Sequence, residues 1–104
     1  MKITNKTISY TKKSYLEKLL SEDPLDTIRK NPKVQDWESI TYSLALSEDF
    51  IREFKDYVYW GWISERQKMS KKFIAEFIDK IDFRRVLQNN LISQEVKDYC
   101  RMFL

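Results

Sequence analysis

The side chains of this sequence that could do chemistry are a run of carboxylates, one thiol and a cluster of aromatic rings. Carboxylates gather between residues 36 and 56, where a close pair could serve as general acid and base. Nothing beside them would raise the pKa of one carboxyl group or place a substrate, so a catalytic pair is not predicted. We expect the polar face of a helix, or a contact surface for a basic partner. The residues are Asp36, Glu38, Glu48, Asp49, Glu53 and Asp56.

Histidine is absent from the 104 residues, and Cys100 is the only cysteine. Histidine is the commonest general base and a principal zinc ligand, so the usual catalytic triads and most zinc sites are excluded. Cys100 has no histidine to activate it and is expected to be a core thiol. One glycine cannot build a P-loop or a dinucleotide-binding fingerprint. The sequence therefore predicts no catalytic residue, no metal and no cofactor, and we expect a protein that is not an enzyme.

Four aromatic side chains surround the only glycine, Gly61, in the stretch DYVYWGWISERQ, residues 56–67. Such a cluster is either a recognition surface or part of a core, and the elements that carry it decide which. A basic group could lie along the same side and grip single-stranded nucleic acid through phosphate contacts and base stacking. The alternative for this group is a solvated lysine face. Its members are Lys68, Lys71, Lys72, Arg84 and Arg85.

The elements follow from a 23-residue periodicity that relates residues 36–58, 59–81 and 82–104. Seven columns agree in chemical type over the three units without a gap. They are Trp37/Trp60/Phe83, Ile40/Ile63/Val86, Leu46/Met69/Ile92, Ser47/Ser70/Ser93, Phe50/Phe73/Val96, Phe54/Phe77/Cys100 and Val58/Ile81/Leu104. Self-similarity at a fixed period of this length is typical of helical repeat proteins.

Each unit predicts two short helices. The serine column precedes an apolar run with helical spacing, as in Phe50, Ile51, Phe54 and Val58, so the serines are predicted to be helix N-caps. The half of each unit that begins with Trp or Phe predicts a helix of one to three turns. Two short helices cannot bury their faces alone, whereas stacked units can. The fold class is therefore predicted to be all-α, a small α-solenoid-like bundle of three degenerate repeats.

Residues 1–33 are predicted to be an N-terminal arm and helical cap on the repeats, within a single domain of residues 1–104. Residues 1–10 could form a short hairpin or an extended arm, and a helix is expected from Thr11. A further short helix is expected to start at Pro24 after the cap Asp23, and to end at Asn31-Pro32.

The register of the repeats assigns the aromatic cluster. Trp60 shares its column with Trp37 and Phe83 and is predicted to be core. Tyr59 shares its column with two aspartates and is predicted to be exposed. Trp62 shares its column with Ser39 and Arg85, so it is either an exposed recognition residue or half-buried between helices.

The stretch LSEDFIREFKDYVYWGWISERQKMSKKFIAEF, residues 46–77, resembles a tandem repeat of giant-virus and phage proteins with units similar to LSExFIxxFxDxVxWxxISxxQK. The resemblance degenerates through residues 78–104 and does not cover residues 1–33. It implies helical repeats and a viral or mobile-element origin, and it implies no activity. Val96 and Cys100 replace phenylalanines of the pattern. The third unit is therefore either a C-terminal capping repeat or a repeat that has simply diverged.

Composition favours an intracellular protein with a bipolar surface. The net charge is +3, but residues 34–58 carry two basic and six acidic side chains while residues 1–33 carry eight and four. No apolar stretch is long enough for a transmembrane helix, and the single cysteine suits a reducing compartment. We expect a cytoplasmic location, in the host cell if the protein is viral, and no membrane partner.

These observations favour a non-enzymatic binding protein, encoded by a virus or phage, that docks on a host protein or complex and blocks it. An inhibitor of a host defence such as an anti-CRISPR protein is one form of this hypothesis. One alternative is a small nucleic-acid-binding protein that uses the basic and aromatic face, and a second is a self-assembling structural protein. The expected contact residues are Tyr59, Trp62, Lys68, Lys71, Lys72, Arg84, Arg85, Asp36, Glu38 and Asp49.

Overall fold

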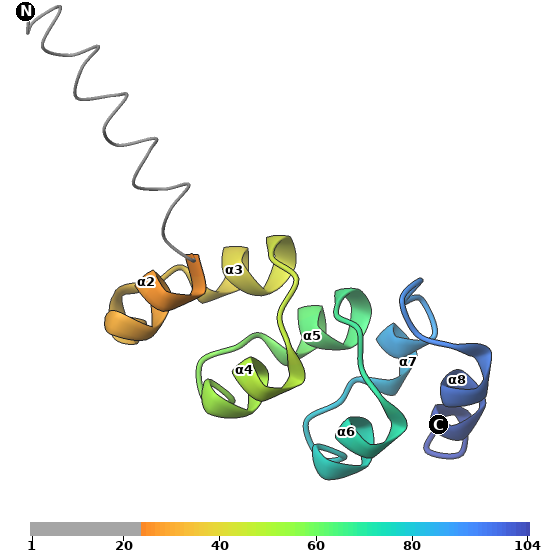
Figure 1. Cartoon of the computed structure of the whole chain (residues 1–104). Coiled ribbons are helices and arrows are strands. Elements are labelled where there is room, and N and C mark those ends of the chain that lie inside the picture. Colours follow the sequence, from red (N-terminus) through yellow and green to blue (C-terminus); the bar gives the residue numbers. More distant parts are fainter. Residues whose placement is uncertain (1–23) are drawn as a thin grey trace, which may run out of the picture. The chain divides into compact units, whose positions relative to one another are not determined.

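The computed structural model describes residues 24–104, and all regular secondary structure within them is helical. This confirms the predicted all-α class for the described part of the chain. The proposed hairpin at residues 1–10, the helix expected from Thr11 and the cap at Asp23 lie outside the described residues. The elements are α2 Pro24–Lys30, the 3-10 helix η1 Pro32–Val34, α3 Trp37–Ser43, α4 Glu48–Glu53, α5 Trp60–Arg66, α6 Lys71–Glu76, α7 Phe83–Val86 and α8 Gln94–Arg101 (Figure 1).

The chain divides into two compact units, residues 1–35 and residues 36–104. In the first, α2 begins at Pro24 and ends before Asn31, as the sequence predicted. The short helix η1, which begins at Pro32, was not predicted. Proline fixes its own φ at a helical value, which suits the first position of such a turn. The second unit begins at Asp36, the predicted start of the first repeat, and the single-domain organisation stays a prediction.

The serine N-caps are confirmed at all three positions. The side-chain oxygens of Ser47, Ser70 and Ser93 accept hydrogen bonds from the backbone N–H three residues later, at the starts of α4, α6 and α8. Two further caps, Asp36 at α3 and Asp82 at α7, were not predicted as such. Each accepts from a free N–H of the first turn. Short polar side chains therefore start five of the six helices of the second unit.

Within the second unit the helices follow one another in a simple order. Helix α3 packs against α5, α5 against α7 and α7 against α8, and Figure 1 shows α3, α5 and α7 following one another with α4 and α6 on one side of them. Side chains join α4 to α6, because Nε of Arg52 donates to both carboxylate oxygens of Glu76 at 2.9 and 3.1 Å. These contacts raise the pKa of Arg52, chiefly through the hydrogen bond to Glu76.

Aromatic contacts recur 23 residues apart with closely similar geometry. The ring centroids of Trp37 and Phe54 lie 5.2 Å apart at 36°, and those of Trp60 and Phe77 lie 4.9 Å apart at 35°. Phe50 also contacts Phe54 at 4.7 Å, and Phe73 contacts Phe77 at 4.8 Å. Each tryptophan thus lies on a pair of phenylalanines from the helix that follows it.

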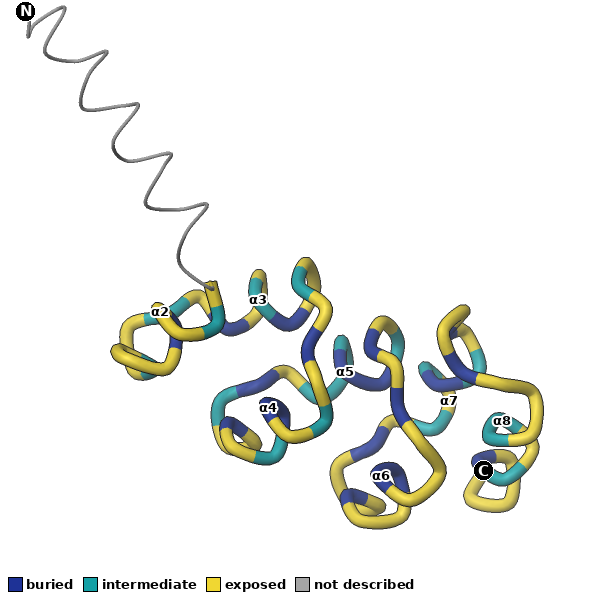
Figure 2. Tube along the Cα trace, in the orientation of Figure 1, coloured by how far each residue is buried: buried dark blue, intermediate teal, exposed yellow. Residues whose placement is uncertain are grey.

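Buried residues occur in every helix from α3 to α8, as the dark blue positions of Figure 2 show. The core prediction for Trp60 needs correction, and one residue of the apolar columns lies at the surface. Trp60 packs on its phenylalanines but is half-buried, because its indole Nε1 donates to the carbonyl of Lys55 near the surface. Leu104 is 60% exposed, since no helix of the described chain lies over it, whereas Val58 and Ile81 precede α5 and α7 and are buried. Within the described residues, no helix has the length and hydropathy needed to cross a membrane.

Candidate functional site

Helices α3, α5 and α7 form a row, and two buried hydroxyl groups hold successive helices of this row together. Oγ1 of Thr41 donates to the carbonyl of Trp37 in its own helix and accepts from the backbone N–H of Tyr59. Twenty-three residues later, Oγ of Ser64 donates to the carbonyl of Trp60 and accepts from the N–H of Asp82. Each hydroxyl therefore fixes where the next helix of the row begins.

Two buried carboxamides hold the ends of these helices. Nε2 of Gln67 donates to the carbonyls of Thr41 and Leu44, at 2.9 and 2.7 Å, and its Oε1 accepts from the N–H of Leu46. These carbonyls lie at the carboxyl end of α3, where backbone acceptors have no intrahelical partner. The Gln67 side chain is thus the C-terminal cap of the preceding helix.

Asn89 repeats this arrangement one helix further along. Its Nδ2 donates to the carbonyls of Ser64 and Gln67, at 2.9 and 2.8 Å, and its Oδ1 accepts from the N–H of Leu91. Asn89 stands 22 residues after Gln67, one fewer than the repeat period, and its side chain is one methylene shorter. Because of this one-residue shift, aligning the units by their apolar columns did not reveal that Gln67 and Asn89 are equivalent.

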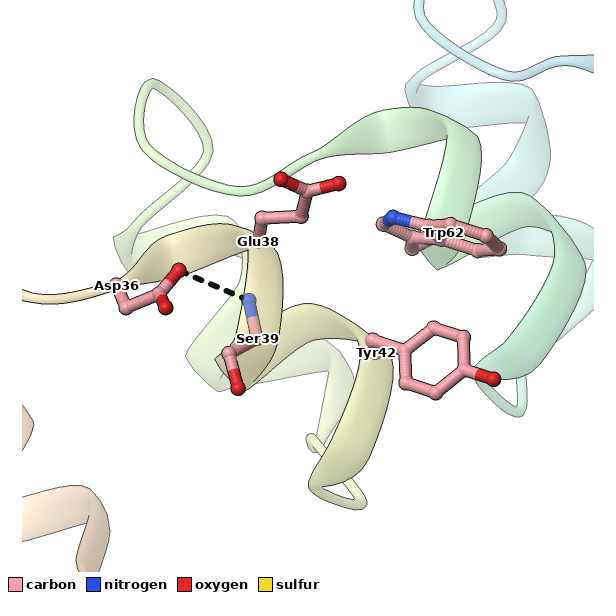
Figure 3. Close-up of a pocket in the computed structure, with 5 residues that line it drawn as sticks. All are labelled: Asp36, Glu38, Ser39, Tyr42 and Trp62. Carbon is pink, nitrogen blue, oxygen red and sulfur yellow. Dashed lines mark hydrogen bonds between the residues drawn. The ribbon is translucent and has the colours of Figure 1, made fainter.

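One surface depression of the row lies between α3 and α5 (Figure 3). Its volume is about 230 Å³, and it is open to solvent. Its lining includes the rings of Tyr42 and Trp62, which meet edge to face with their centroids 4.8 Å apart. The acidic end carries two carboxylates. The lining residues are Asp36, Glu38, Ser39, Tyr42 and Trp62.

An arginine side chain of the protein lies over each ring of this pair. The guanidinium carbon of Arg66 lies 4.0 Å from the Tyr42 ring centroid, and that of Arg85 lies 5.2 Å from the Trp62 centroid. Guanidinium groups are attracted to aromatic faces at these distances. The Arg85 side chain also passes close to Gly61, where an added Cβ would lie 3.5 Å from the guanidinium, an ordinary contact distance. The aromatic pair is therefore held between two arginines, and Trp62 is half-buried between helices.

The charges around the depression differ in whether they are paired. Arg85 forms ion pairs with Glu65 at 3.5 Å and Asp82 at 3.4 Å. Asp36 accepts the N–H of Ser39 as a helix cap, as the dashed line in Figure 3 shows. Neither Asp36 nor Glu38 forms an ion pair among residues 24–104. In Figure 3 the Glu38 carboxylate and the indole nitrogen of Trp62 face one another across the depression. The depression therefore has a negative, aromatic lining.

The predicted contact residues fall into two groups in the structure. The first belongs to the row of α3, α5 and α7 and consists of Asp36, Glu38, Tyr59, Trp62, Arg84 and Arg85. Tyr59 is 49% exposed, as predicted, and its ring lies outside the lining of the depression. Tyr42 was missed, because its column in the repeats is polar (Glu65 and Gln88) and gave no aromatic signal.

The second group belongs to α4, to α6 and to the turn before α6. Asp49 pairs with Arg52 at 2.7 Å. Lys68 and Lys72 are exposed. Nζ of Lys71 lies 4.9 Å from the ring centroid of Tyr99, which offsets its unfavourable place at the amino end of α6. These residues have other neighbours than Arg84 and Arg85, so the described contacts do not join the predicted basic group into one surface.

Two further depressions follow the turns that end α3, α5 and α7. One, of about 400 Å³, is lined by Glu65, Arg66, Gln88, Asn89, Asn90 and Leu91. The other, of about 240 Å³, lies between Tyr42 and Lys68 and shares Leu91 and Arg66 with the first. Their lining is formed largely by exposed loop residues and by the arginine already engaged with Tyr42. Several polar groups of the first depression are already engaged within the chain, because Glu65 pairs with Arg85 and the Asn89 side chain caps the end of α5.

The titratable residues provide no site of their own in the described part of the chain. No group of three His, Cys, Asp or Glu residues within it could hold a metal ion. Cys100 is fully buried in α8, which confirms the predicted core thiol, and this burial raises its pKa. A thiol with a raised pKa is a poor nucleophile.

Comparison with known proteins gave no relative. No family model, no curated protein and no solved structure matches the chain. The repeat resemblance and its viral origin therefore stay predictions, and the function is argued from the geometry above.

Proposed function

We propose that residues 36–104 are three 23-residue helical repeats stacked as a small α-solenoid, and that the protein binds another protein without catalysing a reaction. The observation that carries the binding proposal is the aromatic pair Tyr42 and Trp62, displayed in an open depression on a row of helices that buried hydrogen bonds hold in place.

The repeat architecture is supported by interactions that recur at the same period. The Trp–Phe–Phe contacts, the serine caps and the Thr41 and Ser64 hydroxyls each occur again 23 residues along. Contacts between neighbouring units only are the property that defines a solenoid. The third unit departs most, since Val96 is half-buried and Leu104 exposed.

Protein binding is supported by the kind of surface that the row presents. Tyrosine and tryptophan carry much of the energy at protein interfaces, and a partly exposed aromatic pair is a preferred contact. The shallow, open form of the depression suits a protruding side chain of a partner better than an enclosed small molecule. The ordered hydrogen bonds beneath it would lower the entropy that binding costs.

A viral origin, a host partner in the cytoplasm and a role in blocking host defence are further parts of the proposal. They are supported by the resemblance of residues 46–77 to viral repeats. The mechanism on this view is occlusion, in which the α3–α5–α7 row covers a functional surface of the host protein.

The experiment is capture of partners by the tagged protein from bacterial and eukaryotic cell lysates, with and without nuclease. We expect one protein complex that survives nuclease and is lost with Tyr42→Ala/Trp62→Ala. Tyr99→Ala is the matched control, because it removes a half-buried ring from α8, away from the depression. If the double variant still captures the complex, the proposed surface is wrong. If nuclease abolishes capture by the wild type, the proposal of protein binding is wrong.

The alternative of nucleic-acid binding is supported by three exposed lysines around the start of α6: Lys68, Lys71 and Lys72. Phosphate contacts would make the affinity fall steeply with salt. A titration of single-stranded DNA at several salt concentrations tests this, and binding that is independent of salt would exclude it.

The second alternative, self-assembly, is supported by exposed apolar residues at the carboxyl end of the described chain. They are Leu91, Met102, Phe103 and Leu104. A molar mass in solution that stays at the monomer value up to high concentration would exclude it.

A further inference from the structure

We propose that the depression between α3 and α5 receives one basic side chain, arginine or lysine, of the protein partner. This inference rests on the proposed protein-binding function and names the chemistry of the group that the surface recognises. The binding surface is made by Asp36, Glu38, Tyr42 and Trp62.

The aromatic part of the surface fits the stem and head of such a side chain. Arginine and lysine bury their methylene stems on apolar surface while the charged head stays near polar groups. Tyr42 and Trp62 meet at 86°, which gives a corner rather than a flat plate. A stem lying in this corner would contact both rings and leave its charged head free to reach the acidic end of the depression.

The charged part of the surface fits the head. Glu38 and Asp36 lie at the other side of the depression and have no counter-charge among residues 24–104. The neighbouring arginines do not fill this role, because Arg85 is paired with Glu65 and Asp82, and Arg66 donates to the carbonyl of Tyr42. A partner's guanidinium or ammonium group would therefore complete a negative site rather than compete with a positive one.

The same features disfavour an anionic ligand. A phosphate or carboxylate in the depression would share it with the carboxylates of Asp36 and Glu38, and like charges repel. The indole N–H of Trp62 forms no hydrogen bond in the described chain and could donate to a carbonyl of the partner beside its basic residue.

The chain offers a direct probe of the depression, because its three tryptophans give separate indole N–H signals in ¹⁵N-resolved NMR. The ligands are three blocked peptides, Ac-Gly-Xaa-Gly-NH2, with arginine, lysine or citrulline at the centre. Citrulline has the shape of arginine without its charge. We expect arginine and lysine to shift the Trp62 signal saturably, while the Trp60 signal, from an indole bonded to Lys55, stays in place.

The charge dependence is tested with Asp36→Asn/Glu38→Gln, in which asparagine keeps the helix cap. We expect a Kd for the arginine peptide about five- to tenfold weaker, the size that loss of one or two partly exposed charge contacts gives. Asp79→Asn/Glu95→Gln makes the same change of charge at two exposed positions outside the depression and should leave the Kd unchanged.

Three results would overturn the inference. They are no saturable shift at Trp62, an equal shift with citrulline, or an equal loss of affinity in both charge variants. The proposed function fails separately. If the captured complex depends on Tyr42 and Trp62 but not on Asp36 and Glu38, protein binding stands and the basic side chain is excluded. If capture depends on neither pair, the surface itself is excluded.

Discussion

At the scale of single residues, a few buried polar side chains determine the local structure. Gln67 satisfies two carbonyls and one N–H at the end of α3 and in the turn that follows it, although it belongs to the turn after α5. A buried polar group left without its partner costs more than the bond contributes when formed. The carboxamide is therefore a sensitive point of the fold.

Gln67→Leu should lower the free energy of unfolding by about 3 kcal/mol, because it keeps the volume but leaves three backbone groups unpaired. Chemical denaturation followed by far-UV circular dichroism measures this. Gln88→Leu is the control, since Gln88 is exposed at the end of α7 and should change stability by less than about 0.5 kcal/mol. Similar losses in both variants would contradict the capping role.

Cys100 makes stability fall at alkaline pH. Burial raises the pKa of its thiol, so above about pH 9 the unfolded state loses a proton that the folded state keeps. Stability is then full below pH 9 and declines as pH rises, with a slope of at most about 1.4 kcal/mol per pH unit for this one group, until the thiol of the folded state also ionises. Denaturation of the wild type and of Cys100→Ala between pH 7 and 10.5 measures the difference in slope. Parallel curves would show that the thiol ionises equally in both states.

At the scale of elements, short helices depend on their ends more than on their length. Helix α6 spans Lys71–Glu76, too few residues to be stable in isolation. Its cap Ser70 accepts from Phe73, and the N–H of Ser70 itself donates to Glu48 of α4 at 2.6 Å. The cap thus also joins two helices.

Ser70→Ala should lower the free energy of unfolding by about 1 kcal/mol, and Ser70→Asp should restore most of it, since aspartate caps well. Thermal unfolding measures both. Ser43→Ala, at an exposed position near the end of α3, is the control and should leave Tm unchanged. A loss in Ser70→Ala that Ser70→Asp does not restore would indicate a role other than capping.

Helix positions were predictable because their signals are local. A serine before an apolar run with helical spacing predicted the starts of α4, α6 and α8, and Pro24 predicted the start of α2. Asp36 and Asp82 carried the same capping chemistry, but Tyr59 replaces aspartate in the second unit, so the column gave no repeated capping signal.

The candidate site was less predictable, because it depends on side chains that meet across helices. Trp62 stood out in the sequence, whereas Tyr42 did not, and only packing of α3 on α5 brings the two rings together. The carboxamides were missed for the same reason. Gln67 and Asn89 reach back more than twenty residues, and the shift by one position hides their equivalence.

At the scale of the whole second unit, helices mainly contact others one or two places away in the chain: α3 contacts α5, α5 contacts α7 and α7 contacts α8. Such an arrangement can open from one end while the other stays folded. The Asn89 side chain is the link between the ends of α5 and α7, so its loss should act locally.

Asn89→Leu should therefore speed hydrogen exchange in α7 and α8 more than in α4. Native-state exchange followed by NMR or mass spectrometry measures the amides separately, and Phe54, whose N–H bonds to Phe50, reports on α4. Equal acceleration of all protected amides would show that the unit opens only as a whole. Asn90→Leu, at the exposed neighbouring position, is the control.

The backward reach of the carboxamides also gives the fold a direction in time. As the chain is synthesised, the carbonyls that end α3 are complete before Gln67 exists, and those that end α5 must await Asn89. At about 5–20 residues per second, each turn stays unfinished for roughly one to five seconds after its own residues are made. A nascent chain would thus mature in steps, with its newest turn always open to water, to chaperones or to a waiting partner.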